Sequence, residues 1–139
     1  QLFLSKMKLK QSGTVINIIG MGGRAVRSNY ICGAGGNAAL IGFTNAIGSE
    51  TPDYNVRVFG INPSPTLTDR MIQLFKVRAA KELGDAKKWD ELVNSQKLPF
   101  GRVKSPDEVA ALTVMLSSNK VHYLSGTVID LDGGSQWRS

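Results

Sequence analysis

The sequence predicts an α/β fold built on a mostly parallel sheet, and two observations carry this prediction. Short β-branched runs alternate with longer segments of helical periodicity, in the order strand, helix, strand, and a further strand lies near the end. The first run is nearly continuous rather than alternating in polarity, as in a parallel strand covered on both faces. A crossover between parallel strands is right-handed in nearly all proteins, which places the intervening helix on one face of the sheet.

Three segments predict the strands of this sheet. Residues 14–19 follow a Gln-Ser-Gly turn, and we expect them to form a buried parallel strand. Residues 56–62 form the second β-branched run and end at an Asn-Pro pair. Residues 127–131 follow a Ser-Gly turn and end at Asp-Gly-Gly.

The segments between the strands predict helices. Residues 30–49 carry Leu40, Phe43 and Ile47 on one stripe, and a second stripe consists of small residues: Gly35, Ala38, Ala39, Gly42 and Ala46. Residues 69–83 predict a helix that Gly84 ends, and residues 86–96 predict a second, more polar helix. The sequence Ser105-Pro-Asp-Glu108 is a capping box that begins a helix over residues 106–118, with an inward stripe of Val109, Leu112, Thr113 and Leu116.

Composition excludes several classes of protein. In 139 residues, a hydrophobic fraction of 42% and a charged fraction of 20% are typical of a globular domain. No run approaches the roughly 18 apolar residues of a membrane span, so we expect no membrane association. The net charge of +6 is spread in small groups between acidic residues, which argues against nucleic-acid binding.

Single cysteine and histidine residues limit the possible chemistry further. Cys32 has no partner for an intrachain disulfide, which suits a reducing compartment, and we expect a cytoplasmic protein with Cys32 as a small buried hydrophobe. His122 has no second ligand at metal-binding spacing, so no metal site is expected. The chain begins with Gln1, and residues 2–7 resemble the last turns of a helix, which suggests a piece of a longer protein.

Four motifs in order resemble the C-terminal half of the short-chain dehydrogenase/reductase family over nearly all of the chain. They are Gly13-Thr-Val-Ile-Asn-Ile18; Tyr30 with Asn37-Ala-Ala-Leu40; Val56-Arg-Val-Phe-Gly-Ile-Asn-Pro63 with Thr68; and the stretch from Arg102 to Gly134. The resemblance implies the C-terminal portion of a Rossmann-like, doubly wound parallel sheet, with residues 1–139 as a single partial domain. It also implies NAD or NADP as cofactor, a small-molecule carbonyl or alcohol substrate, and a homo-oligomer, either dimer or tetramer.

In that family a Tyr acts as general acid/base, a Lys four residues later lowers its pKa, and a Ser after the preceding strand binds the substrate carbonyl. Tyr30 matches the tyrosine by its place at the start of the helix. Ala34 stands where the lysine is expected, and Ile19 and Gly20 occupy the serine positions. Asn37 can bond a ribose hydroxyl but carries no charge, whereas Arg24 or Arg27 could supply charge from the glycine-rich loop.

The loop after the second strand is the expected place for the nicotinamide end of the cofactor, because ligands bind at the carboxyl ends of parallel strands. By resemblance we assign cofactor contacts to Pro63, Ser64, Thr66 and Thr68. We add Asn37, which lies two turns after Tyr30 on the same helical face. Ser64 replaces a glycine of the family pattern, and Thr68 can equally be the N-cap of the helix that follows.

Two functions remain open at this stage. The first is an NAD(P)-dependent oxidoreductase present here without its pyrophosphate-binding glycine loop, and the second is a non-catalytic binding or assembly module. The glycines at 20, 22 and 23 and at 33, 35 and 36 lack the spacing of that loop. We therefore expect the chain alone neither to bind NAD(P) tightly nor to reduce a carbonyl.

Overall fold

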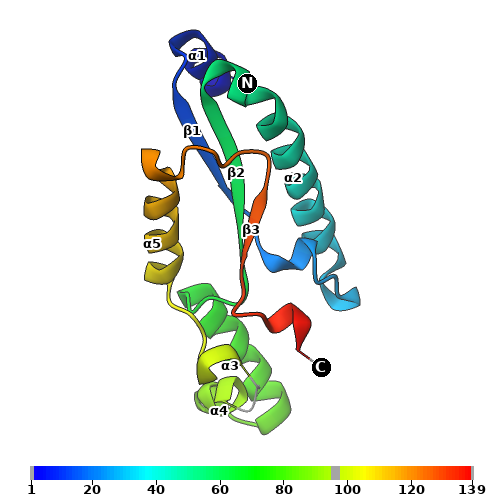
Figure 1. Ribbon diagram of the computed structural model, residues 1–139. Helices are drawn as coiled ribbons and strands as arrows, with labels where there is room; N and C mark the ends of the chain where they lie inside the picture. The colour runs from blue at the N-terminus through cyan, green and yellow to red at the C-terminus, as the bar shows by residue number, and fades with distance from the viewer. Residues whose placement is uncertain (1, 95–97, 139) are drawn as a thin grey trace. The chain divides into compact units, whose positions relative to one another are not determined.

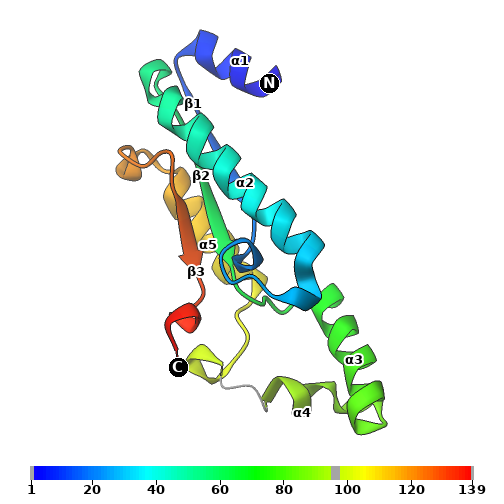
Figure 2. The same ribbon diagram turned by 90° about the vertical axis from the view of Figure 1, so that its right-hand side faces the viewer.

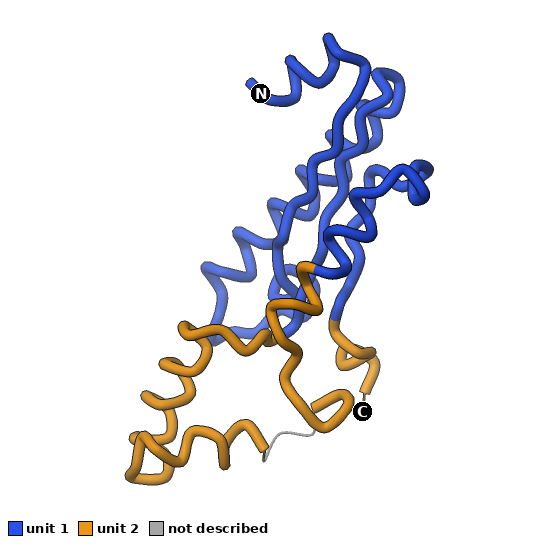
Figure 3. Tube along the Cα trace, turned by 90° about the vertical axis from the view of Figure 1, so that its left-hand side faces the viewer, with its two compact units in different colours: residues 1–64, 111–131 blue, residues 65–110, 132–139 orange. Residues whose placement is uncertain are grey.

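A computed structural model describes residues 2–94 and 98–138 of the protein. The chain forms two compact units, shown in different colours in Figure 3. Unit 1 comprises residues 1–64 and 111–131, and unit 2 comprises residues 65–110 and 132–139. Each unit is described by itself below.

Unit 1 contains a three-stranded parallel sheet in the order β1-β2-β3 (Figure 1). The strands are β1 (Gly13–Ile18), β2 (Val56–Pro63) and β3 (Val128–Leu131). Their register pairs Gly13 with Val56 and Gly60 with Val128. The predicted strand positions and their parallel pairing are confirmed.

Two helices cover the sheet from opposite faces, as Figures 1 and 2 show. Helix α2 (Ile31–Glu50) lies on one face, and the second half of α5 (Pro106–Ser117) lies on the other. A short helix, α1 (Leu2–Lys10), precedes β1, as residues 2–7 suggested. The predicted arrangement of helices on both faces of a parallel sheet is confirmed.

The core of unit 1 lies between the sheet and α5. Phe59, Ile61 and Leu116 are buried there, and partly buried hydrophobic residues surround them: Ile16, Leu112, Val121, Leu124, Ile129 and Leu131. Strand β2 is buried over seven of its eight residues, whereas β1 is only half-buried. The prediction that the first strand is buried is therefore wrong. In this sheet β1 is an edge strand with one neighbour, whereas β2 has a neighbour on each side.

Three small residues of helix α2 are buried against the rest of unit 1. Ala34, Thr44 and Gly48 are buried, and Thr44 Oγ1 accepts a hydrogen bond from Asn17 Nδ2 at 2.9 Å. Leu40 and Phe43 are 45% and 57% exposed, whereas Ile47 of the same predicted stripe is partly buried. The predicted stripe of small residues is exposed throughout. Close helix–sheet contact at Gly48 explains the need for small residues, since a Cβ there would collide with the backbone of Val58 and Gly126.

Unit 2 is helical and has its own small core. Helices α3 (Asp69–Leu83) and α4 (Trp89–Asn94) form it, and its buried residues are Phe75, Ala79, Leu92 and Val93. Gly84 ends α3 with a φ of 73°, as predicted. The end of the predicted helix over 86–96 falls at residues 95–97, which lie outside the described residues.

Short 3-10 turns complete the two units, over Met21–Gly23, Ser28–Tyr30, Thr51–Tyr54, Ala86–Lys88, Pro99–Gly101, Asn119–Val121 and Ser135–Trp137. The predicted capping box at the start of α5 is confirmed. Ser105 Oγ accepts from the amide of Glu108, and Glu108 Oε2 accepts from the amide of Ser105 at 2.8 Å. Arg102 donates both terminal nitrogens to the same carboxylate, at 2.7 and 2.8 Å.

Candidate functional site

Tyr30 lies at the junction of a 3-10 turn and α2, near the carboxyl ends of β1 and β2 in unit 1. Its φ and ψ of −132° and 28° bring the chain into the helix without a side-chain cap. The side chain is half exposed. Its ring occupies space that a side chain at Gly33 would take, since a Cβ built on Gly33 would lie 2.5 Å from Tyr30 Oη. The phenol thus extends along the first turn of the helix.

Asn37 and Tyr30 approach each other at Gly22. A Cβ built on Gly22 would lie 2.8 Å from Tyr30 Cε1 and 3.3 Å from Asn37 Nδ2. The same amide nitrogen lies 3.2 Å from the position of a Cβ on Gly20. Two predicted site residues, Tyr30 at the N-cap of α2 and Asn37 within it, are therefore brought together beside the loop that follows β1.

The positions of the missing lysine and serine have different surroundings. Ala34 is 2% exposed, so its side chain is buried in unit 1. Position 34 follows Tyr30 by four residues and precedes Asn37 by three, which is the spacing of residues on one helical face. Gly20 has a φ of +136° and donates its amide to Asn62 Oδ1 at 3.3 Å, a backbone geometry that a serine would adopt only under strain.

A polar network holds the loop after β1 against the ends of the strands. Arg24 Nε lies 2.9 Å from Asp130 Oδ1, and Arg24 also donates to the carbonyl oxygen of Val128 at 3.1 Å. Asn62, which is fully buried, donates to the same Asp130 oxygen at 3.0 Å and accepts from Gly20. Arg24 therefore anchors the loop, and its charge is already paired with a carboxylate.

The loop after β2 begins in unit 1 with Pro63 and Ser64. Pro63 is the last residue of β2 and pairs with Leu131, and the amide of Ser64 donates to the Leu131 carbonyl at 3.1 Å. The carbonyl oxygen of Pro63 lies 3.9 Å from the position of a Cβ on Gly20. The structure therefore brings Pro63 close to the cluster that contains Tyr30 and Asn37.

Thr66 and Thr68 belong to unit 2. Thr66 forms an isolated parallel bridge with Lys104. Thr68 is the N-cap of α3, where its hydroxyl accepts a hydrogen bond from the Met71 amide at 3.3 Å. The capping role of Thr68 is confirmed, and its hydroxyl keeps one hydrogen for donation to a ligand.

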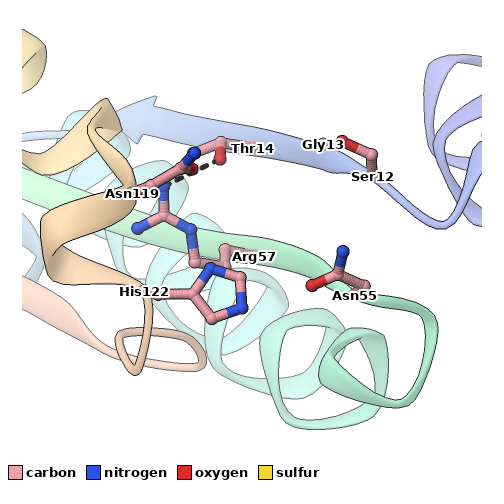
Figure 4. A pocket seen from close by; sticks show the side chains of 7 residues that line it. All are labelled: Ser12, Gly13, Thr14, Asn55, Arg57, Asn119 and His122. Atoms are coloured by element: carbon pink, nitrogen blue, oxygen red, sulfur yellow. Dashed lines mark hydrogen bonds between the residues drawn. The ribbon is translucent and has the colours of Figure 1, made fainter.

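Sequence reasoning missed a second polar cluster, at the amino ends of the strands of unit 1 (Figure 4). Arg57 is 4% exposed, and its guanidinium donates to Thr14 Oγ1 and to the carbonyl oxygens of Leu116, Ser117, Ser118 and Val121. These carbonyls include the C-terminal ones of α5, which have no partner within the helix. An arginine within an otherwise apolar run, Val-Arg-Val-Phe, was the signal in the sequence.

The Arg57 cluster lines a cavity of about 400 Å³ together with Ser12, Gly13, Thr14, Asn55, Asn119 and His122. Figure 4 shows the guanidinium directed toward Thr14 and Asn119. Because its terminal nitrogens are shared among backbone acceptors, the guanidinium fastens the end of α5 to the sheet. We therefore assign it a structural role.

Neither a metal site nor a membrane span occurs among the described residues. Within residues 2–94 and 98–138, no group of three His, Cys, Asp or Glu side chains could hold a metal ion. Among the same residues no helix is both long and apolar enough to cross a membrane. Cys32 is exposed, so its expected burial is wrong; Ala34 and Asn37, not Cys32, lie on the inward side of α2.

Comparison with known proteins gives consistent matches over almost the whole chain. The sequence profile of the enoyl-(acyl carrier protein) reductase family matches residues 2–136. NADPH-dependent reductase BacG of Bacillus subtilis is 34% identical over 131 residues, which cover 94% of this chain and 50% of that protein. D-beta-hydroxybutyrate dehydrogenase of Cupriavidus necator is 34% identical, with 96% of this chain and 52% of that protein covered.

Solved structures show the same relation. L-sorbose reductase from Gluconobacter frateurii, solved with NADPH and L-sorbose, matches with a TM-score of 0.84 at 26% identity, over 94% of this chain and 49% of that one. The chain spans about half the length of the curated relatives it matches. On the strength of the profile match and the shared fold, the chain belongs to the short-chain dehydrogenase/reductase family.

Proposed function

We propose that the chain supplies the catalytic portion of an NAD(P)-dependent oxidoreductase that interconverts a carbonyl and an alcohol, with Tyr30 as general acid/base. The observation that carries the proposal is the placement of the Tyr30 phenol, half exposed, beside Asn37 at the carboxyl ends of β1 and β2. Open α/β sheets bind their ligands at this edge. The names of the relatives, a reductase dependent on NADPH and a hydroxybutyrate dehydrogenase, support the same chemistry.

The side chains of unit 1 fit the nicotinamide–ribose end of the cofactor. Gly20 and Gly22 leave the Asn37 amide without a covering Cβ, so Asn37 Nδ2 can donate to a ribose hydroxyl. The Pro63 carbonyl near Gly20 adds a hydrogen-bond acceptor to the same cluster. By resemblance, Ser64, Thr66 and Thr68 complete the cofactor contacts. The pyrophosphate would then be bound by a part of the protein that this chain does not contain.

In this proposal Tyr30 moves one proton. When bound, the cofactor supplies or accepts the hydride. Tyr30 Oη donates a proton to the carbonyl oxygen in reduction, and it accepts the alcohol proton in oxidation. A free phenol titrates near 10 and a paired cation would lower that pKa, whereas Arg24 is bound to Asp130. Positioning of the substrate against Tyr30 therefore supplies much of the acceleration, and we expect slow turnover.

The experiment that tests the proposal is a titration of NAD(P)H into the 139-residue chain and into the complete protein that carries it. A screen of ketone and alcohol substrates follows on both. We expect the complete protein to bind the cofactor and turn over, and the chain alone to do neither. Tight binding by the chain alone would contradict the assignment of the pyrophosphate contacts to another part of the protein.

A second candidate is a non-catalytic binding or assembly module in a cytoplasmic protein. The replacement of the expected lysine by buried Ala34 and of the expected serine by Gly20 favours it. The sequence that precedes this segment in the complete protein separates the two functions. An intact glycine-rich pyrophosphate loop would support the oxidoreductase, and its loss would support the module.

We also propose that the complete protein is a homodimer or homotetramer that associates through the outer face of α2. Leu40 and Phe43 are exposed on that face, and Cβ atoms on Gly35 and Gly42 would meet nothing within 4 Å. Small residues beside exposed apolar ones allow close symmetric contact. Gly42→Trp should dissociate the oligomer in sedimentation, and an unchanged profile would contradict this interface.

A further inference from the structure

The two glycines that border Tyr30 are not required by their backbone geometry. Six glycines of the chain have φ between +63° and +136°, and neither Gly22 nor Gly33 is among them. Any residue can therefore adopt the backbone conformation at both positions. Within a helix, glycine at position 33 also lowers stability relative to alanine. Glycine at these two positions is therefore explained by neighbouring atoms and not by backbone conformation.

The space beside both glycines is filled by the Tyr30 ring. A Cβ on Gly22 would lie 2.8 Å from Cε1 and 3.1 Å from Cδ1 of the ring. A Cβ on Gly33 would overlap Cζ and lie 2.5 Å from both Cε1 and Oη. Real Cβ atoms do not approach other atoms within 3.0 Å, so even alanine at either position would displace the ring.

Other glycines of α2 provide the contrast. Cβ atoms on Gly35, Gly36 and Gly42 would meet nothing within 4 Å. Gly36 lies one turn after Gly33 on the same helix, with the same intrinsic cost to helix stability and no neighbour to accommodate. A matched pair of positions is thus available, one in contact with the phenol and one in open space.

We propose that Gly22 and Gly33 are positioning residues that form a slot for the Tyr30 phenol. The slot holds the ring over the first turn of α2 beside the Asn37 amide, with its other side open to substrate. This inference rests on the proposed function, in which Tyr30 moves the proton. A phenol held in one orientation reduces the rotation that must be lost before proton transfer, which is how positioning residues accelerate a reaction.

A double-mutant cycle on thermal stability tests the slot without any measurement of activity. Gly33→Ala and Gly36→Ala are each made in the complete protein with Tyr30 and with Tyr30→Ala. We expect Gly36→Ala to raise the melting temperature equally in both backgrounds. Gly33→Ala should raise it only where the ring is absent and should lower it where the ring is present. Equal effects of Gly33→Ala in both backgrounds would overturn the proposal.

Turnover provides the second readout and separates this inference from the proposed function. Gly33→Ala should lower kcat by about tenfold or more while cofactor affinity stays unchanged, because a displaced catalytic group loses its alignment. Gly36→Ala should leave kcat unchanged. If Tyr30→Phe is fully active, the proposed function fails while the stability cycle still decides the slot. If the cycle shows coupling but Gly33→Ala keeps full kcat, the positioning role is overturned.

Discussion

The polar side chains at the two ends of the parallel sheet in unit 1 differ in their burial and in their contacts. At the amino ends, Arg57 is buried and its guanidinium is shared among four carbonyl oxygens and a hydroxyl. At the carboxyl ends, the Tyr30 ring is half exposed and lies against two glycines. A buried charge surrounded by backbone acceptors stabilises the fold, whereas an accessible phenol on a glycine surface is available for a reaction.

Strand β2 connects the two ends and contributes a buried polar residue to each. Arg57 stands at its start, and Asn62 stands near its end, where it binds Asp130 and Gly20. Asn62 supports the loop above the candidate site and does not itself face a substrate, because it is fully buried. If Tyr30 acts as proposed, substitutions at the amino ends should affect stability and substitutions at the carboxyl ends should affect turnover.

The largest expected effect is on stability, from Arg57→Met. The carbonyl oxygens of Leu116, Ser117 and Val121 would lose their donor in a buried place, which we expect to cost about 3 kcal/mol in the free energy of unfolding. Denaturant unfolding of the wild-type protein and of the variant measures this loss in the free energy of unfolding. Arg78→Met is the control, because Arg78 pairs with Glu82 on the exposed surface of α3 and should change stability far less. A small loss with Arg57→Met would remove the structural role assigned to this end.

The next effect is on turnover, from Tyr30→Phe in the complete protein. Loss of one general acid/base should lower kcat by a factor of about a hundred or more, while cofactor affinity and melting temperature stay nearly constant. Tyr123→Phe is the matched control, since Tyr123 is fully exposed in unit 1. Full activity of the Tyr30→Phe variant would move the chemistry away from this end of the sheet.

The elements of the fold were predictable because their signals are local. The Ser105–Glu108 capping box, Gly84 at the end of α3 and the β-branched runs each specify a boundary within a few residues of sequence. The burial of β1 was predicted wrongly, because burial depends on which strands lie beside it. That arrangement is set by distant parts of the chain, and no pattern within residues 13–18 reports it.

The proposed site depends on contacts that the sequence does not specify locally. The buried side of α2, with Ala34, Thr44 and Gly48, coincides with neither stripe predicted from helical spacing, because both stripes contain mostly exposed residues. The path of the Tyr30 ring beside Gly22 and Gly33 involves the loop after β1, which Arg24 fastens to Asp130 from 106 residues away in sequence. Such a contact is visible only in three dimensions.

A cation introduced beside Tyr30 tests whether the carboxyl ends of the strands have the proposed role in catalysis. Asn37→Lys would bring an ammonium group toward the Tyr30 ring through the space beside Gly22. The added positive charge should favour proton transfer by Tyr30 and raise kcat by about tenfold near neutral pH. Asn37→Met serves as the control, because it removes the same amide without adding a charge. An equal gain in kcat from Asn37→Met would contradict the electrostatic explanation.

The smallest effect concerns a charge in unit 2. The Arg102 guanidinium and the Ser105 amide hold the pKa of Glu108 down to about 2, from an ordinary value of 4.5. A carboxyl whose pKa is lowered on folding contributes stability that is complete above the unfolded value and disappears as the pH falls through the folded value. The contribution of Glu108 should therefore be constant above about pH 5 and decline between about pH 4.5 and 2.

Because both partners are largely exposed, at 56% and 42%, the decline should be modest and should shrink in high salt. The difference in melting temperature between the wild-type protein and Glu108→Gln, followed across this pH range, measures it. A difference that stays constant down to pH 2 would show that the Arg102–Glu108 pair does not stabilise the start of α5, leaving the capping hydrogen bonds as its support.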